Sequence, residues 1–366
     1  MKTAPRTSAV SRLALAALAT SALLGVQSTQ AAVRNWDGDT SATWATAGNW
    51  DAAPTNNLTS DIANFNLAIY GGNPVFAPNA VTTSIAGVSI GGSNGNMVLT
   101  TTALSIGSSG ITVASGAGTV SIGAVKIGAN QSWTNNSSSL LTLSSTVTNV
   151  GNVTPFTLML DGSGTGGTTI TGIVSNGGTT GTTALTVNTT AGSTILLANN
   201  TYTGATNISS GTLQIGNGGA AGKLAAASTI TNNGVLIFNR SGTVTQGTDF
   251  STAAITGSGQ LVQNGTSTLT LNAANSYTGA TTISGGTLSV GTTSNLGGAA
   301  SNLVFDGGTL QITGTTLTNV SGIGHTVITN AGKTVGLDIN NSGNIFTFDQ
   351  VLNQTTGVLT KLVQAR

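Results

Sequence analysis

The feature that most constrains this chain is an internal repeat, in which residues 200–216 recur at residues 275–291. The first segment reads NTYTGATNISSGTLQIG and the second reads NSYTGATTISGGTLSVG, with 12 of the 17 aligned positions identical. The likeness continues upstream, where STILLANN (193–200) resembles STLTLNAAN (267–275). A fixed period is the signature of architectures in which each unit buries its apolar face against the next unit.

Within each unit the apolar residues alternate with polar ones. Leu213 and Ile215 are separated by a single residue, as are Leu269 and Leu271, and glycine or asparagine bounds each group. This alternation predicts short β-strands. The first half of the chain shows the same pattern, for example at Ile111 and Val113. No segment after residue 31 sustains a helical period, so we expect almost no helix.

The length of the repeat favours a solenoid. The offset from position 200 to position 275 is too long for one coil and suits three or four coils of short strands. Thr, Asn and Gly fill the positions outside the predicted core, where stacked coils form ladders of like residues. A propeller with blades of roughly 40–50 residues is the structural alternative.

Residues 1–31 have the pattern of a secretory signal peptide. Lys2, Arg6 and Arg12 precede an apolar run at 13–26, and small residues lead up to a predicted cleavage after Ala31. The run is shorter than the ~20 residues that a membrane-spanning helix needs. No later segment is long and apolar enough to be a transmembrane helix, so the mature chain is expected to have none.

Charge excludes some classes of partner. Charged residues make up 5% of the chain, against roughly 25% in an ordinary soluble domain. Without the three basic residues of the leader, seven basic residues face nine Asp, a net charge of −2. A nucleic-acid partner is not expected, because such surfaces need clustered Lys and Arg. The chain has no cysteine, so its stability cannot depend on disulfides.

The repeated segments, NTYTGAT-x-IS-x-GTL-x-x-G in consensus, resemble autotransporter-associated β-strand repeats, also called passenger-associated transport repeats. TGSGQLVQNGTSTLTL (256–271) also resembles that family's repeat unit. The segment NWDGDTSATWATAGNW (35–50) resembles the entry segment of such proteins. The resemblance implies a right-handed parallel β-helix. It also implies export to the outside or outer-membrane surface of a Gram-negative-type bacterium, as a secreted or cell-surface passenger domain.

The resemblance also divides the chain. We expect a signal peptide at 1–31, an N-terminal entry or cap segment at 32–80, irregular solenoid coils at 81–190 and β-strand repeats at 191–366. TGVLTKLVQ (356–364) resembles the opening of a further repeat unit, so the last unit is predicted to be incomplete. No translocating barrel follows, which suggests a separate anchor or a missing C-terminal domain.

Two groups of residues are candidate sites. The repeat-motif residues are expected to be structural, with the tyrosines packing beside turns and the glycines supplying positive φ; they are Tyr202, Gly204, Gly211, Leu213, Tyr277, Gly279, Gly286 and Leu288. Trp36, Trp44 and Trp50 are spaced to share one side of successive strands. They are expected either to cap the first coil or to form a platform on which a carbohydrate stacks.

No catalytic residue, cofactor site or metal site is predicted. Glycoside hydrolysis uses two carboxylates about 5–10 Å apart, and the nine Asp are dispersed, although coils could bring Asp306 near Asp338. His325 is the sole histidine, so a zinc site is not expected. The predicted function is a non-catalytic, adhesin-like structural role with surface glycans or matrix proteins as possible partners. A glycan-binding module is the first alternative, and a polysaccharide-active β-helix enzyme is the second.

Overall fold

The computed structural model describes residues 30–37, 44, 46–66, 75–76, 84–92, 95–151, 153–178, 180–298, 301–319, 321–347, 349 and 359–362. By its internal contacts the chain divides into two units, Met1–Gln30 and Ala31–Arg366, and the strands given below belong to the second unit. Nearly all of the predicted signal peptide falls outside the described residues.

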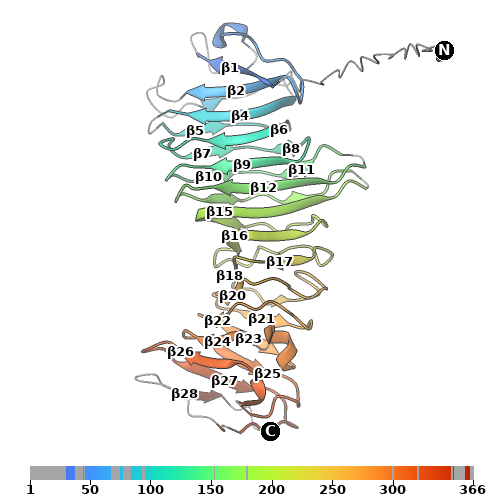
Figure 1. Cartoon of the computed structure of the whole chain (residues 1–366), viewed down its shortest axis with the longest axis vertical. Helices are drawn as coiled ribbons and strands as arrows, with labels where there is room; N and C mark the ends of the chain where they lie inside the picture. The colour runs from blue at the N-terminus through green and yellow to red at the C-terminus, as the bar shows by residue number, and fades with distance from the viewer. Residues whose placement is uncertain are drawn as a thin grey trace, which may run out of the picture. The chain divides into compact units, whose positions relative to one another are not determined.

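The described part of the chain consists of short strands joined by turns (Figure 1). The strands of the first half are β1 (Ala32–Trp36), β2 (Asp61–Asn66), β3 (Val75–Phe76), β4 (Ser84–Gly91), β5 (Met97–Leu99), β6 (Leu104–Val113), β7 (Val120–Ile122), β8 (Val125–Ile127), β9 (Gln131–Asn135), β10 (Leu141–Leu143), β11 (Val147–Asn149), β12 (Phe156–Gly162), β13 (Thr168–Ile170) and β14 (Val174–Ser175).

The strands of the second half are β15 (Thr183–Leu196), β16 (Thr206–Ile215), β17 (Ile230–Asn232), β18 (Val235–Phe238), β19 (Val244–Thr245), β20 (Gln260–Gln263), β21 (Thr268–Leu271), β22 (Thr281–Ile283), β23 (Thr287–Val290), β24 (Asn302–Phe305), β25 (Thr309–Ile312), β26 (Thr326–Thr329), β27 (Val335–Ile339) and β28 (Leu359–Leu362). Helical structure in the described residues is limited to three 3-10 turns: η1 (Ala47–Asn49), η3 (Thr293–Leu296) and η4 (Ser321–Ile323).

Every pairing between these named strands is parallel, and the two strands of each pair lie about one coil apart in the sequence. The strands form a 22-stranded sheet and a 6-stranded sheet. The predicted parallel β-solenoid with almost no helix is therefore confirmed. The propeller alternative is wrong, because propellers belong to the antiparallel architectures.

One hydrogen-bonded ladder runs through most of the stack and measures the coil. It passes in eleven steps along Phe76, Leu99, Ile122, Leu143, Ile170, Leu196, Ile215, Phe238, Gln263, Ile283, Phe305 and Thr329. The mean step is ~23 residues, which is a usual length for one unit of a solenoid. The shortest step joins Leu196 to Ile215, and the longest joins Leu143 to Ile170.

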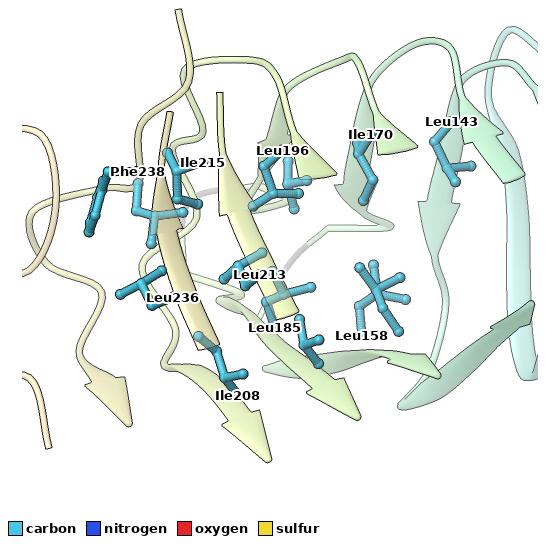
Figure 2. Close-up of a cluster of buried hydrophobic side chains, with 14 of the residues drawn as sticks. Leu143, Leu158, Ile170, Leu185, Leu196, Ile208, Leu213, Ile215, Leu236 and Phe238 are labelled. Carbon is cyan, nitrogen blue, oxygen red and sulfur yellow. The ribbon is translucent and has the colours of Figure 1, made fainter. Parts of the chain in front are cut away.

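The inward side chains of these ladders form a continuous apolar core. Leu143, Ile170, Leu196 and Ile215 lie above one another and are fully buried. In Figure 2 they face a second wall of the coil that carries Leu158, Leu185 and Ile208. Burying each aliphatic side chain contributes roughly 1.5–3 kcal/mol. Because no coil can cover both walls alone, this stabilisation depends on the neighbouring coils.

Candidate functional site

The two copies of the repeat motif build the same local structure around a buried tyrosine. Tyr202 and Tyr277 are both fully buried. The hydroxyl of Tyr202 is hydrogen-bonded to Thr206 Oγ1 at 2.8 Å, and that of Tyr277 to Thr281 Oγ1 at 2.6 Å. Burial raises the pKa of both phenols above their ordinary value, although the bond to threonine acts in the opposite direction. Both tyrosines are thus tied to the start of the following strand.

The glycines of the motif have two different reasons for being glycine. Gly211 and Gly286 have φ of 74° and 53°, which L side chains rarely adopt, as expected. For Gly204 and Gly279 the expected positive φ is wrong. A Cβ at these two positions would lie 2.4 Å from Thr183 O and 2.3 Å from Gly259 O, so the backbone of the preceding coil excludes a side chain.

The two copies occupy different positions around the coil. In the first copy, Leu213 lies in the 22-stranded sheet and stacks on Leu236 and Leu261, and this ladder continues to Thr281. Thr281 is the counterpart of Thr206 in the second copy. In that copy, Leu288 lies in the 6-stranded sheet and pairs with Leu269 and Leu310. The motif is therefore displaced by one strand position between copies.

The three tryptophans of the N-terminal segment form a buried aromatic cluster around Phe65. Trp36, Trp44 and Trp50 are 2%, 1% and 4% exposed. The ring centroids of Trp36 and Trp50 lie 4.9 Å apart with an edge-on geometry, and those of Trp44 and Trp50 lie 5.1 Å apart. Trp50 Nε1 donates to Trp44 O at 2.8 Å. This packing is what a cap on the first coil requires, and it argues against the carbohydrate platform, which needs an exposed ring face.

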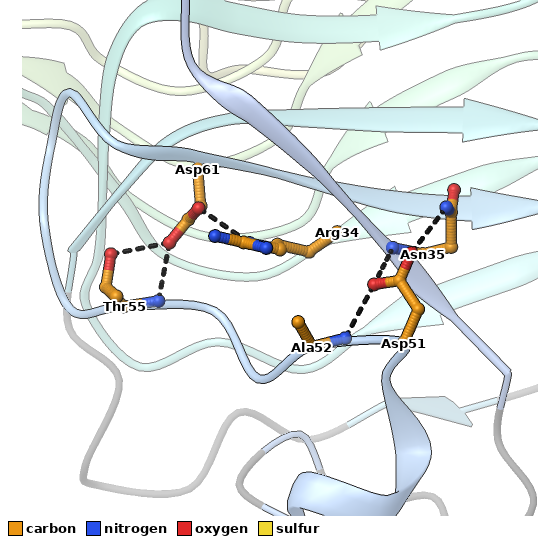
Figure 3. Close-up of polar contacts among 6 residues, drawn as sticks. All are labelled: Arg34, Asn35, Asp51, Ala52, Thr55 and Asp61. Carbon is orange, nitrogen blue, oxygen red and sulfur yellow. Dashed lines mark hydrogen bonds and ion pairs between the residues drawn. The ribbon is translucent and has the colours of Figure 1, made fainter.

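A polar network fixes the strand that leads into this cluster (Figure 3). Arg34 Nε donates to Asp61 Oδ1 at 2.8 Å, and Thr55 donates to Asp61 Oδ2 from its backbone nitrogen at 2.7 Å and its hydroxyl at 2.5 Å. Burial alone raises the pKa of the Asp61 carboxyl, but the bonds from Thr55 and Arg34 outweigh it and lower that pKa. A carboxylate held in this way is suited to joining β1 to β2.

The repeated motif matches a known family of protein repeats. The model of the passenger-associated-transport-repeat matches residues 178–215 and 261–290. Each segment contains one copy of the motif without its last glycine, the first over β15–β16 and the second over β20–β23. The predicted resemblance to passenger-associated transport repeats is therefore confirmed over these two segments. The second matched segment lies within the predicted 191–366 repeat region, whereas the first begins before that region, at residue 178.

One curated relative carries related sequence. The adhesin BmaC autotransporter of Brucella suis biovar 1 (strain 1330) is 42% identical over 89 residues, which is 23% of this chain and 3% of the relative. The chain thus spans only a small fraction of the length of that protein. No solved structure matches the chain.

Asp306, Asp338 and His325 each contact different partners. Asp338 Oδ2 accepts a bond from Gln311 Nε2 at 2.8 Å. Asp306 Oδ1 accepts from Asn330 Nδ2 at 3.0 Å and lies 3.4 Å from Lys333 Nζ. His325 Nδ1 lies 2.9 Å from Ser301 Oγ and 3.0 Å from Ser301 O. Among the described residues, no group of three or more His, Asp, Glu or Cys could hold a metal ion.

Two buried polar side chains outside both candidate sites were missed from the sequence. Trp133, the fourth tryptophan, is fully buried and donates from Nε1 to Gln131 Oε1 at 2.8 Å. Arg240 is 7% exposed, and its Nη2 donates to Ala220 O. Burial lowers the pKa of Arg240, with Asp249 acting in the opposite direction. The alternation around Trp133 was a usable signal, whereas nothing in the sequence indicated that Arg240 is buried.

Proposed function

We propose that this protein is an exported, non-catalytic passenger that is displayed outside the cell and contributes adhesion. The observation that carries the proposal is the pair of passenger-associated transport repeats within a parallel solenoid, together with the similarity to part of an adhesin. Solenoids present long lateral surfaces, which suit attachment more than the enclosed clefts of enzymes. Within the part of the chain that the structure describes, no helix has the length and apolarity to cross a membrane.

The proposal assigns a separate role to each region of the chain. Residues 1–31 would direct export, residues 32–80 would close the first coil, residues 81–190 would form irregular coils, and residues 191–366 would carry the repeats. The partner would be a surface glycan or a matrix protein, recognised by the outside of the coils. Binding of a glycan by the tryptophan cluster is not favoured, since all three rings are packed against Phe65.

Surface display can be tested with an epitope tag placed between Gly218 and Gly219. Both glycines have open space at the Cβ position, so an inserted segment can project from the coil there. We expect an antibody to label intact expressing cells as strongly as lysed cells. A tag in β13, whose Thr168 and Ile170 are buried, is the matched control and is expected to prevent folding. Labelling that appears only after lysis would contradict display.

Adhesion is a separate measurement on the same cells. Attachment to immobilised matrix proteins and glycans should fall severalfold when the gene is deleted and return with the complementing gene. Trp44→Ala should lower the free energy of unfolding by about 3–5 kcal/mol through the cavity it leaves. Trp44→Ala protein that still folds at reduced temperature should bind the matrix proteins and glycans as well as the unaltered protein does. Loss of glycan binding by folded Trp44→Ala protein would instead support the glycan platform.

A further inference from the structure

The outside of the 22-stranded sheet carries a row of side chains in continuous register. The row runs from Val98 through Ser121, Thr142 and Thr169 in the first half of the stack. It continues through seven stacked residues that we name the outer row: Ile195, Gln214, Ile237, Val262, Thr282, Val304 and Ile328. Above the outer row the positions are mostly Ser and Thr, and within it they are mostly Ile and Val.

The outer row lies on the solvent side of its strands. Its residues alternate with the buried ladder that includes Ile215 and Phe238. All are partly exposed, and Ile328 at the end of the row is 37% exposed. Outward positions of a sheet with one solvated face are usually polar. Five aliphatic side chains among the seven positions of the outer row are a departure from that rule.

The neighbouring outward positions are also uncharged. The positions two residues before those of the outer row form a second row on the same face. This second row contains Ser193, Thr212, Val235 and Gln260 and, lower in the stack, the pair Asn302 and Thr326. At the border, Asp306 lies 3.4 Å from Lys333, so these opposite charges compensate each other. The face therefore offers apolar contact without a charge that would select a charged partner.

We propose that this face is where two copies of the chain associate, outer row against outer row. The repeat distance between its side chains is the strand spacing of about 4.8 Å. A second copy presents the same spacing, and a two-fold arrangement sets the same patch against itself. The formal net charge of the whole chain is only +1, so Coulomb repulsion between copies is small.

The size of the face predicts a weak association. Seven coils span about 30 Å, and two rows of side chains make the strip about 14 Å wide. Such a strip buries on the order of 1,000 Å² in total from both copies, which is at the lower limit for specific interfaces. Self-association is therefore expected at tens to hundreds of micromolar. Dense display on a surface would raise the local concentration into this range.

Sedimentation velocity of the purified full chain from about 10 to 500 μM tests the proposal. We expect a concentration-dependent dimer, and I237K/V304K should raise the dissociation constant at least tenfold. The matched control T112K/T186K places two lysines on outward positions of β6 and β15, away from the outer row, and should leave the constant unchanged. Circular dichroism verifies that all three proteins are folded.

Cysteine cross-linking locates the contact, because the chain has no cysteine of its own. Val262 is the middle member of the outer row, so V262C faces its own counterpart in a two-fold dimer. A short bis-maleimide should cross-link V262C and should not cross-link T186C. A chain that stays monomeric at the highest concentration would overturn the proposal. So would equal association of I237K/V304K, or equal cross-linking at the two positions. The proposal is independent of surface display, which is measured on cells.

Discussion

The two copies of the repeat motif share their local structure and differ in where that structure lies on the coil. Each has a buried tyrosine bonded to a threonine and a positive-φ glycine as the first residue of its Gly-Thr-Leu segment. In the first copy the motif forms one continuous strand, β16, whereas in the second it is divided into β22 and β23. Leu213 and Leu288 consequently lie in different sheets.

The displacement follows from a mismatch between two periods. The motif recurs from Tyr202 to Tyr277, and this offset is longer than the roughly 69 residues that three coils of average length occupy. The excess advances the motif by about one strand position. Local sequence therefore determines the turn and the strand, and the lengths of the intervening loops determine which sheet the strand joins. The motif therefore keeps its local conformation at two different positions around the coil.

The largest expected effect is a loss of stability when the turn glycines, but not the threonines beside them, are replaced by valine. Gly211→Val and Gly286→Val should each lower the free energy of unfolding by about 3 kcal/mol or more, since each forces a β-branched residue into a positive φ. A Cβ at Gly211 would also lie 2.6 Å from Thr189 O, and one at Gly286 would lie 2.3 Å from Ser267 O. Urea denaturation provides the measurement.

Thr212→Val and Thr287→Val are the matched controls, because these half-buried residues already have a β-branched side chain. Each should change stability by about 0.5 kcal/mol or less. If Gly211→Val were costly and Gly286→Val were not, the two turns would not be equivalent. Equal costs for the glycine and threonine substitutions would contradict the register of both copies.

The sequence predicted those aspects of the fold that depend on neighbouring residues. Alternation at Leu213 and Ile215 identified a strand and its inward face, and Gly211 and Gly286 were correctly expected at positive φ. Gly204 was misjudged, because the carbonyl of Thr183 that excludes its side chain lies one coil away. The sequence left open whether Trp44 is buried in a cap or exposed on a platform, since its burial depends on Phe65 of β2. Contacts between coils are absent from local patterns.

A smaller effect tests whether the two tyrosines are equivalent. Tyr202→Phe and Tyr277→Phe each remove one buried hydrogen bond and should cost about 1–2 kcal/mol. After the first change Thr206 Oγ1 keeps Ser228 Oγ at 2.9 Å. After the second, Thr281 Oγ1 keeps only Leu296 O at 3.3 Å, so Tyr277→Phe should be the more costly.

A double substitution separates the hydrogen bond from the packing. Tyr277→Phe combined with Thr281→Val removes both partners of the bond, and such paired replacement is often nearly neutral. We therefore expect the double variant to be more stable than Tyr277→Phe alone in urea denaturation. A double variant with the summed cost of both single changes would mean that the hydroxyls do not act as a pair.

The smallest effect is a dependence on alkaline pH that both copies should share. Burial raises the pKa of Tyr202 and Tyr277 in the folded chain, whereas an unfolded tyrosine ionises near 10. The unfolded state therefore loses these protons first as pH rises. The stabilisation that the two buried tyrosines contribute is therefore fully present below about pH 10 and declines above it. Urea midpoints measured from neutral to strongly alkaline pH should show a constant region followed by a fall.

The two single Phe variants make this a test of local equivalence. Each should reduce the steepness of the fall above about pH 10 by a similar amount, because each tyrosine is fully buried and has one threonine partner. Lysine ionisation is common to all the proteins and cancels in the comparison. If only one variant changed the slope, the unaffected tyrosine would ionise alike in the folded and unfolded chain. The two copies of the motif would then not give their tyrosines the same environment in the two sheets.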